Sequence, residues 1–566
     1  MDTFWGLIRH NIAAGNMTHI VWLGAIIVTM LILAVLHHRW RFYDQKLKKW
    51  QELCAIPLLI TIIHYCIYVR DSDFLKPYTS MYLIAVIALV LAMCGRDRKG
   101  YRIAAPIVGV MTAFLGVWCC IMMPGITRNF SGKSYTESFH ALAQEMDRSY
   151  VLKEWKEVDF SALEAKYMPM VKEAEQDKDP GKFADAVEMF CYELHDGHIS
   201  VHCNFDTDKY ESVFGMHEYG LAMIELDNGE VIAVCTDDEV QKLGIDDGTV
   251  ITRWNGKPVL QAAAEDVPDH GESVKANADR VAALYLSTVG GDTVEVSFLD
   301  ENGKEQTVTL HDMGENHTFC EAYDAFTQIQ KTDQPNFSTK MLSDKCGYLT
   351  LNVQSTGNGL RDIFSEFSSG SCKWAKDMFR KKLNDLKKQG MECLVIDLRC
   401  NMGGCDAPTT ALCELLTDDK WYAQGLGIRK NGEYISTADY YISGTGEFAD
   451  LKIVALTNLE CISGGDAASL YLSRLPNVTL AGITDPNGSG QYTGGCCVLS
   501  DKLVGVTYPT GLTLDENGEP KIDPRGDRVS RNAVEVRIPL DYDAAMKIFC
   551  DGQDYELDWA VQYLSR

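Results

Sequence analysis

The sequence predicts a multidomain protein with N-terminal transmembrane α-helices, a helical segment, a small β-rich module and an α/β domain. Three observations predict this order. The first fifth of the chain is much more apolar than the remainder, the stretch after it has helical periodicity, and strands and helices alternate from about residue 346. With 566 residues the chain is long enough to form several hydrophobic cores.

The composition excludes one class of partner and gives no sign of a metal. Acidic residues number 79 and basic residues 53, so the formal charge is -26. Nucleic-acid binding requires a basic face, and we therefore expect no nucleic-acid partner. The close cysteine pairs, Cys400 with Cys405 and Cys496 with Cys497, lack a histidine at zinc-site spacing. We expect neither a metal nor a cofactor.

Four apolar stretches predict a membrane domain over residues 1–126. Each is near the length of about 20 residues that a helix needs to cross a bilayer. A signal peptide does not explain the first stretch, because no small-residue cleavage site follows it and further apolar stretches do. The stretches lie at about 18–36, 53–69, 79–95 and 103–124.

The charges of the loops predict the orientation of this membrane domain. Basic residues concentrate in the first and third loops, which places those loops in the cytoplasm. Everything after about residue 126 is then extracytoplasmic, in a multi-pass protein of the cell membrane; loss of one span would invert this. The expected partners are the lipid bilayer and, as a further candidate, another membrane protein. The basic residues are Arg39, Arg41, Lys46, Lys48, Lys49, Arg96, Arg98, Lys99 and Arg102.

Residues 127–205 are predicted to form a helical segment that ends in a turn. Apolar residues recur at helical spacing from Phe139 to Met146 and from Phe183 to Leu194. The Asp-Gly pair that follows is a turn signal, and it places His198 at the start of a short strand. There the imidazole could point into a cleft, or it could be an ordinary solvated surface histidine.

Residues 206–312 are predicted to form a β-rich module with one helix near 274–285. The run from Leu243 to Val259 resembles a PDZ domain in its circularly permuted bacterial-protease form, with Thr249 where aspartate is usual. The resemblance implies binding of an extended peptide, which adds a strand to the edge of the sheet. The alternative is a plain β-module that packs against the C-terminal domain.

Residues 313–566 have the pattern of an α/β domain with a partly parallel sheet. The strand at Ile453–Leu456 leads into a turn with Ser463, and a helix follows. A serine at such a junction exposes its hydroxyl, and the backbone N–H groups after it are free to hold an oxyanion. The other predicted elements are strands at 347–353 and 393–399 and helices at 374–388 and 407–417.

Five motifs, in order over about residues 134–564, resemble the tail-specific (C-terminal processing) protease family, which includes the tricorn core protease. The resemblance implies a crotonase-like, ClpP-related catalytic domain. It also implies a serine endopeptidase that cleaves peptide bonds in protein tails or in loosely folded substrates. The motifs are Leu194–His198, Gly347–Leu351, Leu394–Gly404 (with Cys400 and Met402 as substitutions), Ser463–Asp466 and Asp554–Leu564.

Carried over residue by residue, the resemblance makes Ser463 the nucleophile. Gly464 would supply one oxyanion N–H and the turn of Gly403 and Gly404 the other. Two fixed donors of this kind can lower the barrier to attack on an amide by several kcal/mol, on the order of 3 kcal/mol each.

The general base departs from one branch of the family. Bacterial members use a lysine where this chain has Gly488, whereas the tricorn branch uses a histidine that matches His198. Neutral histidine near pH 7 is a competent base. Family position places the orienting carboxylate between residues 515 and 523, where Glu519 and Asp523 are both candidates. Ser489, near the lost lysine, either lines the site or is an ordinary loop residue.

Two other functions remain open on the sequence alone. One is a catalytically inactive family member that binds a peptide or ligand at the membrane; the retinoid-binding repeats of the vertebrate eye have this fold without proteolysis. The missing lysine favours it, whereas the retained Ser463, His198 and turn glycines favour the enzyme. The other is a channel or transporter formed by the four spans, which carry few of the charges expected on a translocation path.

Overall fold

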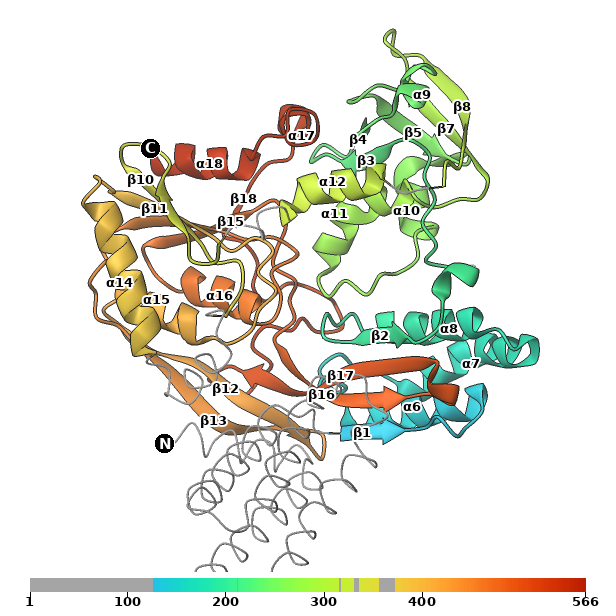
Figure 1. Cartoon of the computed structure of the whole chain (residues 1–566), viewed down its shortest axis with the longest axis horizontal. Coiled ribbons are helices and arrows are strands. Elements are labelled where there is room, and N and C mark those ends of the chain that lie inside the picture. The colour runs from blue at the N-terminus through green and yellow to red at the C-terminus, as the bar shows by residue number, and fades with distance from the viewer. Residues whose placement is uncertain (1–125, 211, 315–316, 330–334, 356–371) are drawn as a thin grey trace, which may run out of the picture.

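The computed structural model describes residues 126–566 except for 211, 315–316, 330–334 and 356–371 (Figure 1). The four expected membrane spans therefore lie outside the described residues. Within the described ranges, no helix combines the length and the apolar character needed to cross a membrane. None of the 14 cysteines after residue 126, all of which the structure describes, is paired in a disulfide.

Helices α6 (Tyr135–Ser149), α7 (Phe160–Asp177) and α8 (Pro180–Tyr192) form the segment for which the sequence predicts helices. Each begins at a capping side chain: Ser134 accepts from the backbone N–H of Glu137, and Asp159 and Asp179 cap the other two helices in the same way. Their apolar faces pack with one another and with strands of the first sheet.

The first sheet has the strand order β1-β16-β17-β12-β13, and β2 also pairs with β17. Strand β1 runs parallel to β16, while β2, β12 and β16 run antiparallel to β17. The helical segment packs against this sheet (Figure 1). The strands are β1 (Ile126–Asn129), β2 (Ser200–Cys203), β12 (Lys420–Lys430), β13 (Glu433–Ser443), β16 (Gln491–Val498) and β17 (Val504–Leu514).

The second sheet has the order β18-β15-β14-β11-β10-β9 and is parallel from β10 to β18. Helices cover both faces, which explains why its strands are continuous apolar runs. In β14, Ile453 and Ala455 pack toward α14, α15 and α16, whereas Val454 and Leu456 pack toward α12, α17 and α18. The strands are β9 (Thr339–Met341), β10 (Cys346–Thr350), β11 (Cys393–Asp397), β14 (Lys452–Leu456), β15 (Val478–Gly482) and β18 (Val536–Arg537).

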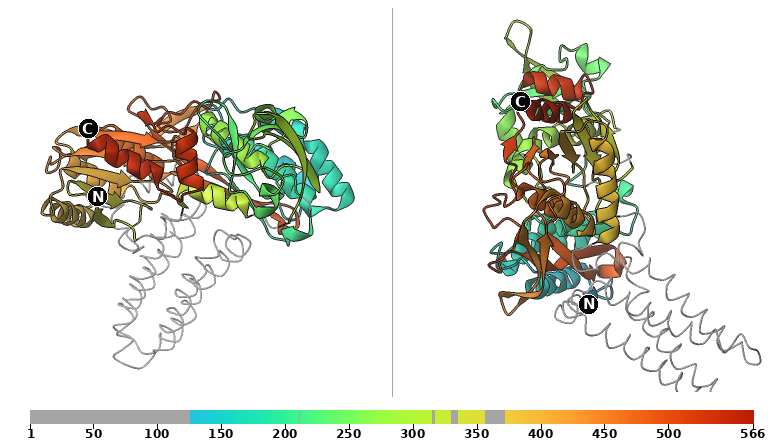
Figure 2. Two further views of the ribbon diagram at one scale, coloured as in Figure 1. Left: turned by 90° about the horizontal axis from the view of Figure 1, so that it is seen from above. Right: turned by 90° about the vertical axis from the view of Figure 1, so that its left-hand side faces the viewer.

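Helices α14 and α15 on this sheet match the predicted helices at 374–388 and 407–417 to within one residue at each end. Figure 2 shows this α/β part at one end of the molecule and the helical segment with the β-rich module at the other. The helices are α12 (Thr318–Thr327), α14 (Lys373–Lys387), α15 (Ala407–Leu416), α16 (Gly464–Ser473), α17 (Tyr542–Phe549) and α18 (Tyr555–Leu564).

The third sheet forms the middle module and is antiparallel, with the order β3-β4-β5-β7-β8 and β6 paired with β5. The resemblance of this module to a PDZ domain remains a prediction. Its elements are β3 (Ala222–Glu225), β4 (Val231–Val234), α9 (Asp238–Gln241), β5 (Val250–Trp254), β6 (Lys257–Pro258), α10 (Val259–Glu265), α11 (Lys275–Leu286), β7 (Thr293–Leu299) and β8 (Glu305–His311).

A buried guanidinium fastens α18 to the end of β11. The Arg399 side chain is 0% exposed and donates to Asp397 at 2.9 Å, to Asp554 at 2.8 Å and to Glu556 at 3.0 Å. A buried charge is tolerated only when it is paired in this way. The C-terminal motif of the sequence therefore has a structural role at this position.

We expect Arg399→Ala to lower the free energy of unfolding by about 3–5 kcal/mol, because it leaves buried carboxylates without their cation. Urea denaturation followed by fluorescence measures the change. Lys381→Ala, which removes a side chain 80% exposed from a surface ion pair, should change stability by less than about 1 kcal/mol. Equal effects of the two substitutions would contradict the role given to Arg399.

Candidate active site

Ser463 lies at a strained turn between β14 and α16. It is the N-cap of α16, with φ 62° and ψ -120°. A non-glycine residue in such a conformation costs on the order of 1–3 kcal/mol, and such strain gathers at functional sites. The residue is half-buried, and no described residue hydrogen-bonds to its Oγ. The turn therefore presents a free hydroxyl, as the sequence predicts.

The glycine turn after β11 lies directly against this serine. Gly403 and Gly404 have φ of +85° and +122°, and a Cβ on Gly403 would lie 2.7 Å from Ser463 Cβ. Only glycine allows this approach. The N–H of Gly403 already donates to Asn401 Oδ1 at 3.0 Å. Among the described residues, the N–H groups of Gly404 and Gly464 have no acceptor, so these two are available to an oxyanion.

His198 lies between α8 and β2, in a turn fixed by several buried groups. Asp196 accepts from the His198 backbone N–H at 2.9 Å and from Tyr150 Oη at 2.7 Å. Lys156 Nζ donates to the carbonyls of Leu194 and His195 at 3.0 and 2.5 Å. The imidazole Nδ1 is itself buried. His198 is therefore a partly buried residue whose turn is held by hydrogen bonds, not a solvated surface residue.

Ser489 joins the histidine turn to the serine turn. Its carbonyl accepts from the Ser463 N–H at 2.9 Å, and its Oγ accepts from the Gly197 N–H at 3.0 Å. Ser273 of the middle module lies 2.9 Å from the same Oγ. Of the two roles that the sequence leaves open for Ser489, the structure shows a buried residue that contacts both turns.

The two acidic candidates lie in different surroundings. Glu519 is half-exposed and forms an ion pair with Arg525 at 3.4 Å. Asp523 is 0% exposed and accepts hydrogen bonds from the Gln491 side chain and from the Gly490 N–H. Burial raises the pKa of Asp523. The structure thus brings Asp523 toward the site and leaves Glu519 at the surface.

Gln491 contacts Asp523 and affects the titration of His198. Its Nε2 donates to Asp523, while its Oε1 and His198 Nδ1 are both buried without a hydrogen-bond partner in the described ranges. Burial lowers the pKa of His198, whereas Asp196 and the Gln491 carboxamide raise it, so the carboxamide lies beside the ring. The sequence analysis did not find Gln491, because nothing local marks a glutamine at the start of a strand.

Two further residues are buried here: Asp466, the last residue of the nucleophile motif, and Gln354, which the sequence analysis did not single out. Asp466 accepts from the N–H groups of Gly488 at 3.1 Å and Ser489 at 3.0 Å, and it thereby holds their loop against α16. Burial raises the pKa of Asp466 to about 7. The carboxamide of Gln354 is buried beside Gly464 and has no hydrogen-bond partner among the described residues.

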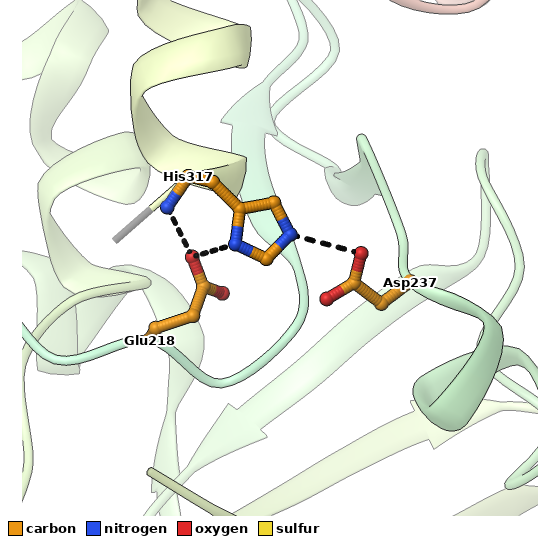
Figure 3. A group of neighbouring side chains, drawn as sticks. All are labelled: Glu218, Asp237 and His317. Atoms are coloured by element: carbon orange, nitrogen blue, oxygen red, sulfur yellow. Dashed lines mark hydrogen bonds and ion pairs between the residues drawn. The ribbon is translucent and has the colours of Figure 1, made fainter. Parts of the chain in front are cut away.

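One cluster outside this site has the residue types of a metal centre (Figure 3). His317 contacts Glu218 through Nδ1 at 3.4 Å and Asp237 through Nε2 at 3.1 Å. Glu218 is 1% exposed and accepts the backbone N–H of Thr318 at the start of α12. Both ring nitrogens and the buried carboxylate are thus engaged within the protein, and the cluster ties α12 to the middle module.

Comparisons with known proteins place this geometry in context. The model of Peptidase family S41 matches residues 345–526, which include Ser463, both turn glycines and Asp523. A search of curated proteins gave no match. The family match covers four of the six strands of the second sheet and four of the six strands of the first, whereas His198 lies before it.

Solved structures give a wider match. The structure of mature CPAF complexed with lactacystin is 14% identical, covers 76% of this chain and 99% of its own, and has a TM-score of 0.50. The structure of mature CPAF is 13% identical, covers 76% of this chain and 98% of its own, and has a TM-score of 0.51. A photosystem II D1 C-terminal processing protease is 17% identical, covers 75% of this chain and 98% of its own, and has a TM-score of 0.33. The likeness to CPAF shows a common fold. The chain therefore carries a Peptidase family S41 domain over residues 345–526 and is a serine peptidase.

Proposed function

We propose that the chain is an endopeptidase that cleaves protein tails or loosely folded proteins, with Ser463 as nucleophile and His198 as general base. The observation that carries this proposal is the pair of hydrogen bonds to Ser489, which fix the turns of Ser463 and His198 side by side. The free N–H groups of Gly464 and Gly404 support it, because attack on an amide creates an oxyanion that needs donors.

In the proposed mechanism, Ser463 Oγ attacks the substrate carbonyl while His198 Nε2 takes the hydroxyl proton. The resulting imidazolium donates Nδ1–H to Gln491 Oε1, whose amide in turn donates to Asp523. His198 then gives its proton to the leaving amine and an acyl-enzyme forms. Water, deprotonated by the same imidazole, hydrolyses this ester and restores the serine.

The relay through Gln491 replaces the direct contact between carboxylate and imidazole that a serine, histidine and acid triad uses. A carboxamide can accept with its oxygen and donate with its nitrogen at the same time. When it accepts Nδ1–H from the imidazolium, it passes part of the charge to Asp523. The raised pKa of Asp523 fits a site in which this acid is shielded from water.

The experiment that tests this function is labelling of the full chain with a fluorophosphonate, followed by peptide mapping, alongside hydrolysis of an unstructured protein such as casein. We expect the label on Ser463 and cleavage of casein. An absence of both label and cleavage would favour the alternative of a catalytically inactive peptide-binding protein. Label at a different serine would refute the assigned nucleophile.

We also propose that the apolar stretches before residue 126 anchor the chain in the cell membrane, with the peptidase domain outside the cytoplasm. The loop charges support this orientation. In intact cells that express the chain, a membrane-impermeant amine reagent should modify lysines after residue 126. Modification only after the cells are lysed would refute the orientation.

A further inference from the structure

A pocket of about 110 Å³ opens beside the turn that carries His198. Tyr192 and Gly197 line it from the helical segment, His270 and Glu272 from the middle module, and Asn487 from the loop behind Ser463. Pockets for whole small molecules have volumes of about 300–1,000 Å³. This one has room for a single amino-acid side chain.

The pocket wall adjoins the turn of His198, and Gly197 of that wall also lies against Ile462, which is not itself a lining residue. A Cβ on Gly197 would lie 2.5 Å from Asn487 Oδ1 and 2.7 Å from Ile462 Cδ1. Gly197 directly precedes His198, and Ile462 directly precedes Ser463. A peptide held across the serine would therefore place the side chain of a residue close to the scissile bond at this pocket.

The charge of the pocket is negative. Two carboxylates line it, and that of Asp196 already accepts hydrogen bonds from Tyr150 and from the backbone of His198. The Glu272 carboxylate has no hydrogen bond or ion pair with any described residue; Arg528 donates to its backbone carbonyl instead. The Glu272 side chain is half-buried, and an unpaired carboxylate in such a position is stabilised when a cation binds to it.

The pKa of Glu272 agrees with this setting. Burial raises it to about 7, with Glu460 adding to the shift and Arg528 opposing it. A cation bound at the carboxylate would favour the ionised form. No lysine or arginine lines the pocket among the described residues; the Arg528 guanidinium lies at the Glu272 backbone, outside the pocket lining.

The walls suit a long side chain that ends in a charge. His270 stacks on Tyr285 with ring centroids 4.0 Å apart. Tyr192, the last residue of α8, also lines the pocket. The methylene stems of lysine and arginine pack well on such rings while the charged head reaches a carboxylate. A short acidic side chain would be repelled.

We propose that this pocket binds a lysine or arginine side chain of the substrate, close to the scissile bond, and that Glu272 determines this specificity. The role in substrate specificity rests on the proposed function. The presence of a cation-binding site at Glu272 can be tested without hydrolysis.

The test uses the full chain with Ser463→Ala, so that binding is measured and cleavage is not. Hexapeptides carry either lysine or norleucine, which lacks only the amino group, at each position in turn. At one position we expect lysine to bind at least about tenfold more tightly than norleucine, and Glu272→Gln to abolish the difference. Equal affinities throughout, or a lysine preference that survives Glu272→Gln, would overturn the proposal.

A matched control is Glu265→Gln on α10 of the same module, whose carboxylate pairs with Lys257 at the surface. This change should leave the lysine preference intact, and its loss would show that the net charge of the module is responsible instead of Glu272. If the wild-type chain cleaves casein, mapped cleavage sites should be enriched in basic residues at one fixed position. That enrichment should disappear in Glu272→Gln.

Discussion

Ser463→Ala should lower the rate of peptide hydrolysis by at least roughly 1,000-fold, because the substitution removes the atom that forms the acyl-enzyme. The turn glycines and the substrate-binding surface stay in place, so binding of peptide should persist and the loss should be in kcat. Hydrolysis of a fluorogenic casein by the full chain measures the effect. The substitution is small and lies at a half-buried position, so the fold should be retained.

The matched control for this prediction is Ser473→Ala on the same helix. Ser473 Oγ donates only to the carbonyl of Leu470, a bond confined to α16. We expect no more than about a twofold change in its rate, as for substitutions away from a site. Substantial hydrolysis by the Ser463 variant would mean that a different residue attacks the substrate.

His198→Ala should lower kcat by roughly 1,000-fold or more, and wild-type activity should fall only at low pH. The base must be neutral to accept the serine proton. Burial lowers the pKa of His198 from its ordinary value, so it remains neutral to a lower pH than an exposed histidine does. The acid limb of kcat/KM should therefore have an apparent pKa below about 6.5.

His202→Ala provides the comparison, because this histidine is exposed on β2 only four residues away. Its pH profile should match that of the wild type. Gln491→Met removes the carboxamide that raises the pKa of His198, so the acid limb should move to still lower pH while kcat falls. A lower kcat with an unmoved acid limb would show that Gln491 supports only the local structure.

The parallel sheet could be predicted from the sequence because its strands are buried on both faces. Runs such as Ile453–Leu456 are continuously apolar and are followed by turns and helices. The first sheet was not predicted. Strands β12 and β13 lack a regular alternation of polar and apolar residues and contain bulges, and β1 pairs with β16 across more than half of the chain. Such pairings leave no local pattern that a sequence window detects.

The residues of the site likewise fall into those that could be predicted from the sequence and those that could not. Ser463 and the glycines Gly403 and Gly404 occupy turns whose conformations the sequence itself requires, so they could be identified from local motifs. Glu519 and Asp523 lie four residues apart and look equivalent in the sequence. Only the folded chain buries Asp523 and exposes Glu519. Gln491 has no local signature at all, since its role depends on neighbours from three separate segments.

The nucleophile and its base belong to different sheets, which has a practical consequence for anyone who purifies this enzyme. Ser463 follows a strand of the second sheet, whereas His198 and Gln491 adjoin strands of the first. A shift of about 1 Å between these layers could cost about 100-fold in rate with both hydrophobic cores intact. The absorbance of a preparation would then count inactive and active molecules alike, and titration of the serine with a covalent inhibitor is the measure of functional concentration.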